Sequence, residues 1–112
     1  MKVITNPNII CFDVDGTLID WNIRPNEDRK MVAITTPWGS ETVVELEHVT
    51  RRLKAQHMQG HYIIVWSQGG QEWGEFVIKA LGLGDCVDLL LTKPKWAFDD
   101  LPIEDWLKRS IP

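Results

Sequence analysis

Three short apolar runs, separated by segments with helical spacing, are the feature that most limits the folds open to this chain of 112 residues. The runs cover residues 9–14, 62–66 and 87–91, and each has the length and apolar character of a buried strand. Strands that alternate with helices connect through right-handed crossovers and form a parallel sheet. The pattern therefore predicts an α/β fold of the Rossmann-like sandwich type, and the length predicts a single domain over residues 1–112.

Two helices are expected between these strands. The first should begin at a capping box formed by Thr42 and Glu45 and should end at Gly60. Its buried stripe is expected to consist of Leu46, Val49 and Leu53. The second should end at Gly82, and its apolar residues at helical spacing are Trp73, Phe76, Val77, Ala80 and Leu81.

Two further segments lie outside this alternation. Residues 20–39 contain the turn formers Pro-Asn-Glu-Asp at positions 25–28 and a short extended run, which predict a β-hairpin that projects from the sheet. Near the other end of the chain, Pro102 is expected to open a short helix. The apolar residues that this helix should turn inward are Ile103, Trp106 and Leu107.

The composition excludes several classes of protein. Sixteen acidic and twelve basic residues give a formal net charge of −4, which does not favour a nucleic-acid partner. The two cysteines, Cys11 and Cys86, are too few for a disulfide framework and are expected to be buried free thiols. Neither a signal-peptide pattern nor a membrane-length apolar run is present, so we expect a cytoplasmic location and no membrane partner.

The chemistry is concentrated in residues 11–18, Cys-Phe-Asp-Val-Asp-Gly-Thr-Leu. An apolar strand here delivers Asp13 and Asp15 at its end, and parallel α/β sheets bind ligands outside the carboxyl ends of their strands. Residues two apart on a strand point to the same side, so both carboxylates can reach one ligand. Because adjacent carboxylates repel each other, a divalent cation between them is the usual arrangement.

Residues 13–17, with the strand before them, resemble the first signature of the haloacid dehalogenase (HAD) superfamily, DxDGT. Three later segments are similar to the remaining signatures in the same order. Ser67, after the second strand, resembles the second signature, and Lys93, beyond the third strand, resembles the third, with Lys95 as the alternative. The acidic pair at positions 99 and 100 resembles the fourth.

The resemblance implies a HAD-like Rossmann-type sandwich and a phosphatase that acts through an aspartyl-phosphate. Asp13 would attack phosphorus, and Asp15 would protonate the leaving oxygen and later accept a proton from water. Ser67 would contact the phosphate oxygens, and Lys93 would neutralise their charge.

The resemblance also implies Mg²⁺ as the cofactor. Its ligands would be the side chain of Asp13, the backbone carbonyl of Asp15 and an acid of the fourth signature, which is Asp99 or Asp100. We favour Asp100 as the direct ligand, by analogy with family members in which the second acid of the pair binds the metal. The alternative role for this pair is to cap the final helix.

Neither position at which HAD proteins insert a cap domain has room for one here, so the resemblance points to the capless class with a β-hairpin flap. The expected partner is a phosphorylated substrate: a metabolite, a nucleotide or a macromolecular phosphate end. A second copy of the chain could cover the open site. In the hairpin, Arg24, Arg29 and Lys30 are expected to meet an anionic substrate beside Trp21 and Trp38. The alternatives are a phosphotransferase and a non-catalytic binding or regulatory module on a HAD scaffold.

Overall fold

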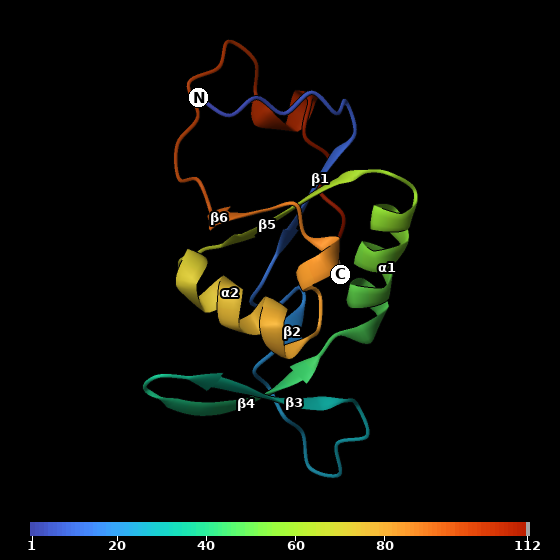
Figure 1. The fold of residues 1–112 in the computed structure, drawn as a ribbon, viewed down its shortest axis with the longest axis vertical. Helices are drawn as coiled ribbons and strands as arrows, with labels where there is room; N and C mark the ends of the chain where they lie inside the picture. The colour runs from blue at the N-terminus through green and yellow to red at the C-terminus, as the bar shows by residue number, and fades with distance from the viewer. Residues whose placement is uncertain (112) are drawn as a thin grey trace.

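A parallel sheet of three strands forms the centre of the computed structural model, which describes residues 1–111. The strands are β1 (Ile9–Asp13), β5 (Tyr62–Ser67) and β6 (Leu89–Thr92), in the order β1-β5-β6 (Figure 1). They coincide with the three apolar runs to within two residues at each end, so these predicted strands are confirmed. The register pairs Asp13 with Trp66 and Ser67 with Thr92, which brings the carboxyl ends of the strands to one edge.

Two α-helices pack on one face of this sheet. Helix α1 (Glu47–Met58) leads into β5, and α2 (Gln71–Ala80) connects β5 with β6. Because both right-handed crossovers step in the same direction across the sheet, both helices lie on the same side of it. The residues that form the core between the helices and the sheet include Phe12, Val49, Leu53, Ile63, Val65 and Val77.

A second, antiparallel sheet lies at the lower end of the molecule in Figure 1, next to α2. It has the order β2-β4-β3 and consists of β2 (Ile19–Asp20), β3 (Met31–Thr36) and β4 (Gly39–Glu45). Ile34 and Val43 join it to the main core, where both are fully buried. Thus the described residues form an α/β fold, as predicted, with a parallel and an antiparallel sheet.

The hairpin predicted over residues 20–39 is present with different bounds. It pairs β3 with β4, and its two-residue turn is Pro37-Trp38 rather than the segment 25–28. That segment lies in the loop between β2 and β3. The hydroxyl of Thr36 closes the turn, because it accepts a hydrogen bond from the Trp38 amide (3.2 Å) and donates one to the Gly39 carbonyl (3.1 Å).

The predicted capping box at Thr42 and Glu45 is wrong. Both residues belong to β4, where the intervening Val43 and Val44 are fully buried, and β-branched residues favour a pleated, packed strand over a helix start. Helix α1 begins after Leu46 instead. The Glu45 side chain still contributes to the first turn of α1, since it accepts a hydrogen bond from the hydroxyl of Thr50 at 2.8 Å.

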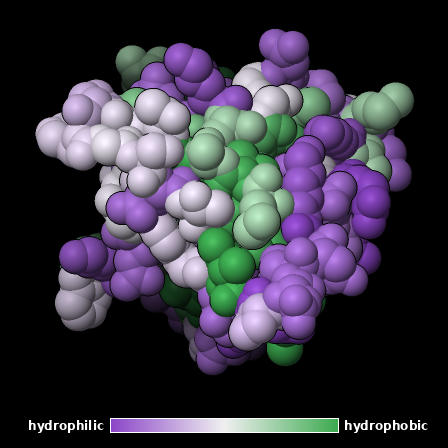
Figure 2. Space-filling model, turned by 90° about the horizontal axis from the view of Figure 1, so that it is seen from below, coloured by the Kyte–Doolittle hydropathy of each residue, from purple (hydrophilic) through white to green (hydrophobic). Residues whose placement is uncertain are grey.

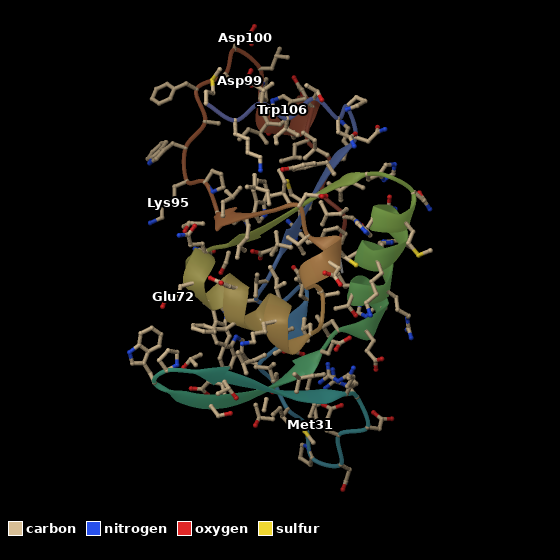
Figure 3. The ribbon with its side chains drawn as sticks, viewed as in Figure 1. Met31, Glu72, Lys95, Asp99, Asp100 and Trp106 are labelled. Carbon is tan, nitrogen blue, oxygen red and sulfur yellow. The ribbon has the colours of Figure 1, made fainter. Side chains whose placement is uncertain are left out.

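The predicted inward-facing helix after Pro102 is also wrong. The chain forms a single 3-10 turn there, η2 (Ile103–Asp105). Ile103 and Trp106 are 44% and 51% exposed, so neither belongs to the core. Figure 3 shows Trp106 at the upper end of the molecule, remote from the hairpin. This segment has too few apolar residues at regular spacing to hold a longer helix against the sheet.

The lower face of the molecule, below the antiparallel sheet, carries a patch of hydrophobic side chains bordered by hydrophilic ones (Figure 2). Met31, at this end of the molecule in Figure 3, is 54% exposed. Cys11 and Cys86 are free and half-buried, and burial raises the pKa of the Cys11 thiol. Neither helix within residues 1–111 combines the length and the apolar character needed to cross a membrane.

Arg29 ties the loop between β2 and β3 to the antiparallel sheet. Its guanidinium donates to Glu27 at 2.7 Å and to Asp20, at the end of β2, at 3.1 Å. These bonds lower the pKa of Glu27 from 4.5 to about 2, with the side-chain hydrogen bond from Arg29 as the largest cause. The pKa of Asp20 is lowered as well, first by the Asn22 amide and then by Arg29.

We predict that Arg29→Gln raises the pKa of Glu27 from about 2 toward its ordinary value of 4.5. A carboxylate with a lowered pKa stabilises the folded state above its ordinary pKa, and this contribution is lost as the pH falls through the lowered value. Because the variant lacks this contribution at every pH, its stability should fall less than that of the wild type as the pH is lowered from 4.5 toward 2. NMR titration of the Glu27 carboxyl carbon measures the shift, and Arg24→Gln, which keeps the Arg29 bonds, should leave it near 2.

Candidate functional site

The site predicted from the first signature lies where β1 ends and the chain turns toward β2. Asp13 is the last residue of β1, and Asp15 lies in the turn that follows, where both are half-buried. Gly16 completes this turn with φ of +78°, a backbone conformation that side chains with a Cβ rarely adopt. The turn therefore places both residues at the carboxyl edge of the sheet.

Two tryptophans hold the Asp15 carboxylate in place. The indole N–H of Trp21 donates to Oδ1 of Asp15 at 2.8 Å, and that of Trp73 donates to the same oxygen at 3.2 Å. The two rings stack with centroids 5.4 Å apart and planes inclined by 20°. Because both bonds fall on Oδ1, the other oxygen, Oδ2, is left to meet a ligand.

Ser67 contributes a hydroxyl at the end of β5. It is fully buried, and its Oγ has no hydrogen-bond partner within residues 1–111. Gly69 follows it closely: a Cβ added there would lie 3.6 Å from Ser67 Oγ and 3.8 Å from Asp15 Oδ2. Thus Ser67 and Asp15 converge on the space beside Gly69. A buried hydroxyl usually has a partner, so the unpartnered hydroxyl beside Asp15 makes Ser67 a candidate ligand-binding residue.

Helix α2 begins directly beyond these residues. Gly70 precedes it with φ of +104° and ψ of +155°, a combination essentially restricted to glycine. The amide of Gln71, the first helical residue, donates to the hydroxyl of Thr92 at the end of β6 (3.1 Å). This bond fixes the start of α2 against the carboxyl edge of the sheet.

Lys93 and Lys95 differ in their distance from this edge. The amide of Lys93 donates to the Ser67 carbonyl at 2.9 Å, and Lys93 is half-buried. Lys95 is exposed, and Figure 3 shows it on the outer side of the molecule. The backbone of Lys93 is therefore the one fixed against Ser67.

Asp99 and Asp100 lie apart from Asp13 and Asp15. Both are exposed on the loop at the upper end of the molecule (Figure 3), and the Asp99 carboxylate accepts a hydrogen bond from the amide of Leu101 at 3.0 Å. Trp96 and Phe98 on the same segment are 87% and 103% exposed, so it does not dock as a strand. Within residues 1–111, no three His, Cys, Asp or Glu side chains are grouped as a metal site.

An aromatic groove adjoins the carboxylates. It has a volume of about 330 Å³ and lies between the end of the β3–β4 hairpin and α2. Its four aromatic side chains are Trp21, Trp38, Trp73 and Phe76, and the other lining residues are Thr36, Glu41, Gly69 and Glu72. Trp21, Trp73 and Gly69 belong both to this groove and to the surroundings of Asp15. The groove therefore lies next to the residues that surround Asp15.

Sequence reasoning did not identify the partners of Asp15. It assigned Trp73 to the core, against which this residue does pack, and Trp21 to a hairpin contact surface. It did not predict that both indoles donate hydrogen bonds to Asp15. Six tryptophans in 112 residues are an unusual number for a chain of this length, and this was the available signal. Spacing could not reveal the contact, because Trp73 is 58 positions from Asp15.

The expected role of the hairpin cations is not supported for two of the three residues. Arg29 is engaged by Asp20 and Glu27, and Lys30 forms an ion pair with Glu45 at 3.3 Å. Arg24 is exposed and does not line the aromatic groove. The charged side chains that line the groove are acidic instead.

Comparison with known proteins adds no relative: no family model matches this chain, and neither a curated protein nor a solved structure is significantly similar to it.

We predict that Ser67→Ala leaves the free energy of unfolding unchanged or raises it by up to about 1 kcal/mol, because it removes a buried hydroxyl that no described residue satisfies. Thr50→Val is the matched control. Its hydroxyl is also buried but donates to Glu45, so its loss should cost about 1–3 kcal/mol. Urea denaturation measures both values. An equal loss in the two variants would show that Ser67 has a structural partner.

Proposed function

We propose that this chain is a magnesium-dependent phosphomonoester hydrolase of the HAD type, with Asp13 as its nucleophile. The observation that supports this best is the convergence of Asp15 Oδ2 and Ser67 Oγ beside Gly69, next to the end of β1. A phosphoryl group in this space would meet a nucleophile, a proton donor and a hydrogen-bond donor at once.

The proposed reaction has two steps. In the first, a carboxylate oxygen of Asp13 attacks phosphorus, the bond to the leaving oxygen breaks, and Asp15 gives that oxygen a proton. In the second, Asp15 takes a proton from water as the water oxygen attacks phosphorus, which releases phosphate and restores Asp13. The indole bonds to Oδ1 of Asp15 suit this role, since they orient the carboxyl group and leave Oδ2 available for the proton.

Ser67 and Lys93 would stabilise the charge that develops on the phosphoryl oxygens. The Ser67 hydroxyl would donate to one phosphoryl oxygen, and it would not have to break a hydrogen bond to any described residue to do so. Lys93 begins from a backbone position fixed against Ser67, so its ammonium is the cation best placed to approach. Lys95, two residues farther along the exposed segment, is the weaker candidate.

The Asp13 carboxylate and the backbone carbonyl of Asp15 are hard oxygen donors of the kind that Mg²⁺ prefers, and Mg²⁺ is commonly held by one or two carboxylates together with substrate phosphate and water. These two residues therefore fit the ion. Asp99 and Asp100 do not contribute to this donor set in the arrangement described above. When bound, Mg²⁺ would supply charge neutralisation for the phosphate and the two repelling carboxylates.

We predict that hydrolysis of an aryl phosphate requires Mg²⁺ and falls to background in Asp13→Asn, which keeps the size of the side chain but removes its nucleophilic charge. Asp15→Asn should lower turnover by about 10²–10⁴-fold, the usual contribution of general acid–base catalysis. Asp85→Asn, at an exposed carboxylate in η1 (Gly84–Cys86), is the matched control. Wild-type activity in purified Asp13→Asn would refute the function.

A separate prediction concerns the acidic pair of the fourth signature. Because Asp99 and Asp100 are exposed and lie away from Asp13, the double substitution Asp99→Asn with Asp100→Asn should leave the dependence of the rate on Mg²⁺ concentration unchanged. The measurement is the Mg²⁺ concentration that gives half-maximal aryl phosphate hydrolysis. A large increase in that concentration would mean that this segment folds onto the site when it acts.

A further inference from the structure

We infer that the aromatic groove beside Asp15 binds an alkylammonium group, which makes an amino-alcohol phosphomonoester the substrate class of this site. The groove joins two features that together recognise an organic cation. Its walls are aromatic rings, which attract cations through their electron-rich faces, and its charged lining residues are Glu41 and Glu72. None of the lining residues within the described chain is basic.

The aromatic walls come from both sides of the groove. Trp21 and Trp73 form the inner pair, which also holds Asp15. Trp38, at the turn of the hairpin, meets Phe76 of α2 edge to face, with centroids 6.4 Å apart and planes at 88°, and forms the outer pair. Trp38 is 76% exposed, so much of its surface is available to a ligand. Exposed aromatic rings gathered at one groove are a common feature of recognition sites.

The two carboxylates reach the groove from opposite sides. Glu72 lies in the first turn of α2, one turn before Phe76, and Figure 3 shows it on the side of the helix toward the end of the hairpin. Glu41 lies on β4 directly opposite Ile34. Residues directly opposite on antiparallel strands point to the same face, and Ile34 is fully buried against the core, so Glu41 points toward α2.

The charge of the groove selects the kind of ligand. The helix dipole stabilises an acidic side chain in the first turn of a helix, which accounts for Glu72. It does not account for Glu41, which lies on the facing strand. An anionic group would be repelled by both carboxylates, and a neutral ring would leave both without a counterion. Lys79, the nearest lysine along α2, lines a separate hollow that shares Phe76. A cation is thus the group that complements the lining.

The order of groups along the groove matches a short zwitterionic phosphate ester. Gly69, beside Asp15 and Ser67, marks the phosphoryl end, and Trp38 with Phe76 marks the other. A volume of about 330 Å³ is at the lower end of the range for small-molecule sites, roughly 300–1,000 Å³. The leaving alcohol would therefore be small, with its ammonium group among the aromatic rings.

The binding part of this inference can be tested without turnover. Choline is the probe, and 3,3-dimethyl-1-butanol, which has the same shape without the charge, is its comparison. NMR titration of the tryptophan indole signals should show saturable shifts for Trp38 and Trp73 with choline, and at least tenfold weaker binding of the neutral alcohol. The indole of Trp96, 87% exposed on a distant segment, should not respond. Equal binding of the two probes, or no binding of choline, would overturn the inference.

Substitutions test whether Glu41 and Glu72 supply the negative charge that binds choline. Glu41→Gln combined with Glu72→Gln should weaken choline binding by about tenfold or more, and Trp38→Ala should weaken it as well. Glu75→Gln is the matched control, since Glu75 is an exposed acid on α2 that does not line the groove. The same loss in Glu75→Gln would indicate a general effect of charge and would contradict a site.

The substrate part rests on the proposed phosphatase function. For the full chain with Mg²⁺, kcat/KM should be at least tenfold higher for phosphocholine than for 3,3-dimethylbutyl phosphate, and this ratio should fall in the Glu41→Gln, Glu72→Gln variant. The two proposals fail separately. Choline binding without hydrolysis of any phosphate ester would refute the phosphatase, whereas hydrolysis of both esters at equal kcat/KM would refute the cation preference.

Discussion

The Asp15 carboxylate accepts hydrogen bonds from Trp21 and Trp73, and these contacts join three parts of the fold at one oxygen atom. Trp21 follows β2 at the root of the antiparallel sheet, Trp73 belongs to α2, and Asp15 follows β1. Hydrogen bonds to charged groups contribute about 1.5–3 kcal/mol each, and a stacked aromatic pair adds about 0.5–1.5 kcal/mol. The same interaction that orients the Asp15 carboxyl group therefore connects the antiparallel sheet and α2 around it.

The parts of the fold that could be predicted from sequence are those in which local pattern and burial agree. The strands β1, β5 and β6 coincide with continuous apolar runs, because each has one face sealed beneath the helices. Helix α2 follows from its apolar spacing, and it ends before Gly82, whose φ is +67°. The carboxyl edge of the sheet was predictable for the same reason, and with it the placement of Asp13 and Asp15.

The antiparallel sheet was harder to predict, because more than one segment has the residue types of a hairpin turn. Residues 25–28 have the residue types of a tight turn, but Arg29 anchors them as a loop through Asp20 and Glu27. The segment Thr42 to Glu45 has the residue types of a helix start, yet in the structure it pairs as part of β4 with β3 and β2. Local chemistry permits both outcomes, and tertiary pairing decides between them.

The C-terminal segment shows a different limit. Its apolar residues suggest a short helix, but Phe98 and Trp106 are exposed, and the Asp99 carboxylate accepts a hydrogen bond from the nearby Leu101 amide. The order of signatures along the chain carried no information on whether this segment would dock. The distant bonds between Asp15 and the tryptophans were hidden for the converse reason, since residues far apart in sequence meet only after the sheets are assembled.

The site thus has a tightly packed floor, formed by the strand ends, and a wall, formed by the hairpin, that fewer contacts hold in place. The floor is the end of β1 and β5, where Phe12, Val65 and Ser67 are buried and the strands pair along their full lengths. The wall is the hairpin, which is held by Ile34, Val43 and the Trp21 contact to Asp15. Regions with fewer buried contacts open at lower free energy than the core. Loosening of the hairpin would widen the groove but leave Asp13 and Ser67 in place, so the width of the groove and the positions of these two residues depend on different parts of the chain.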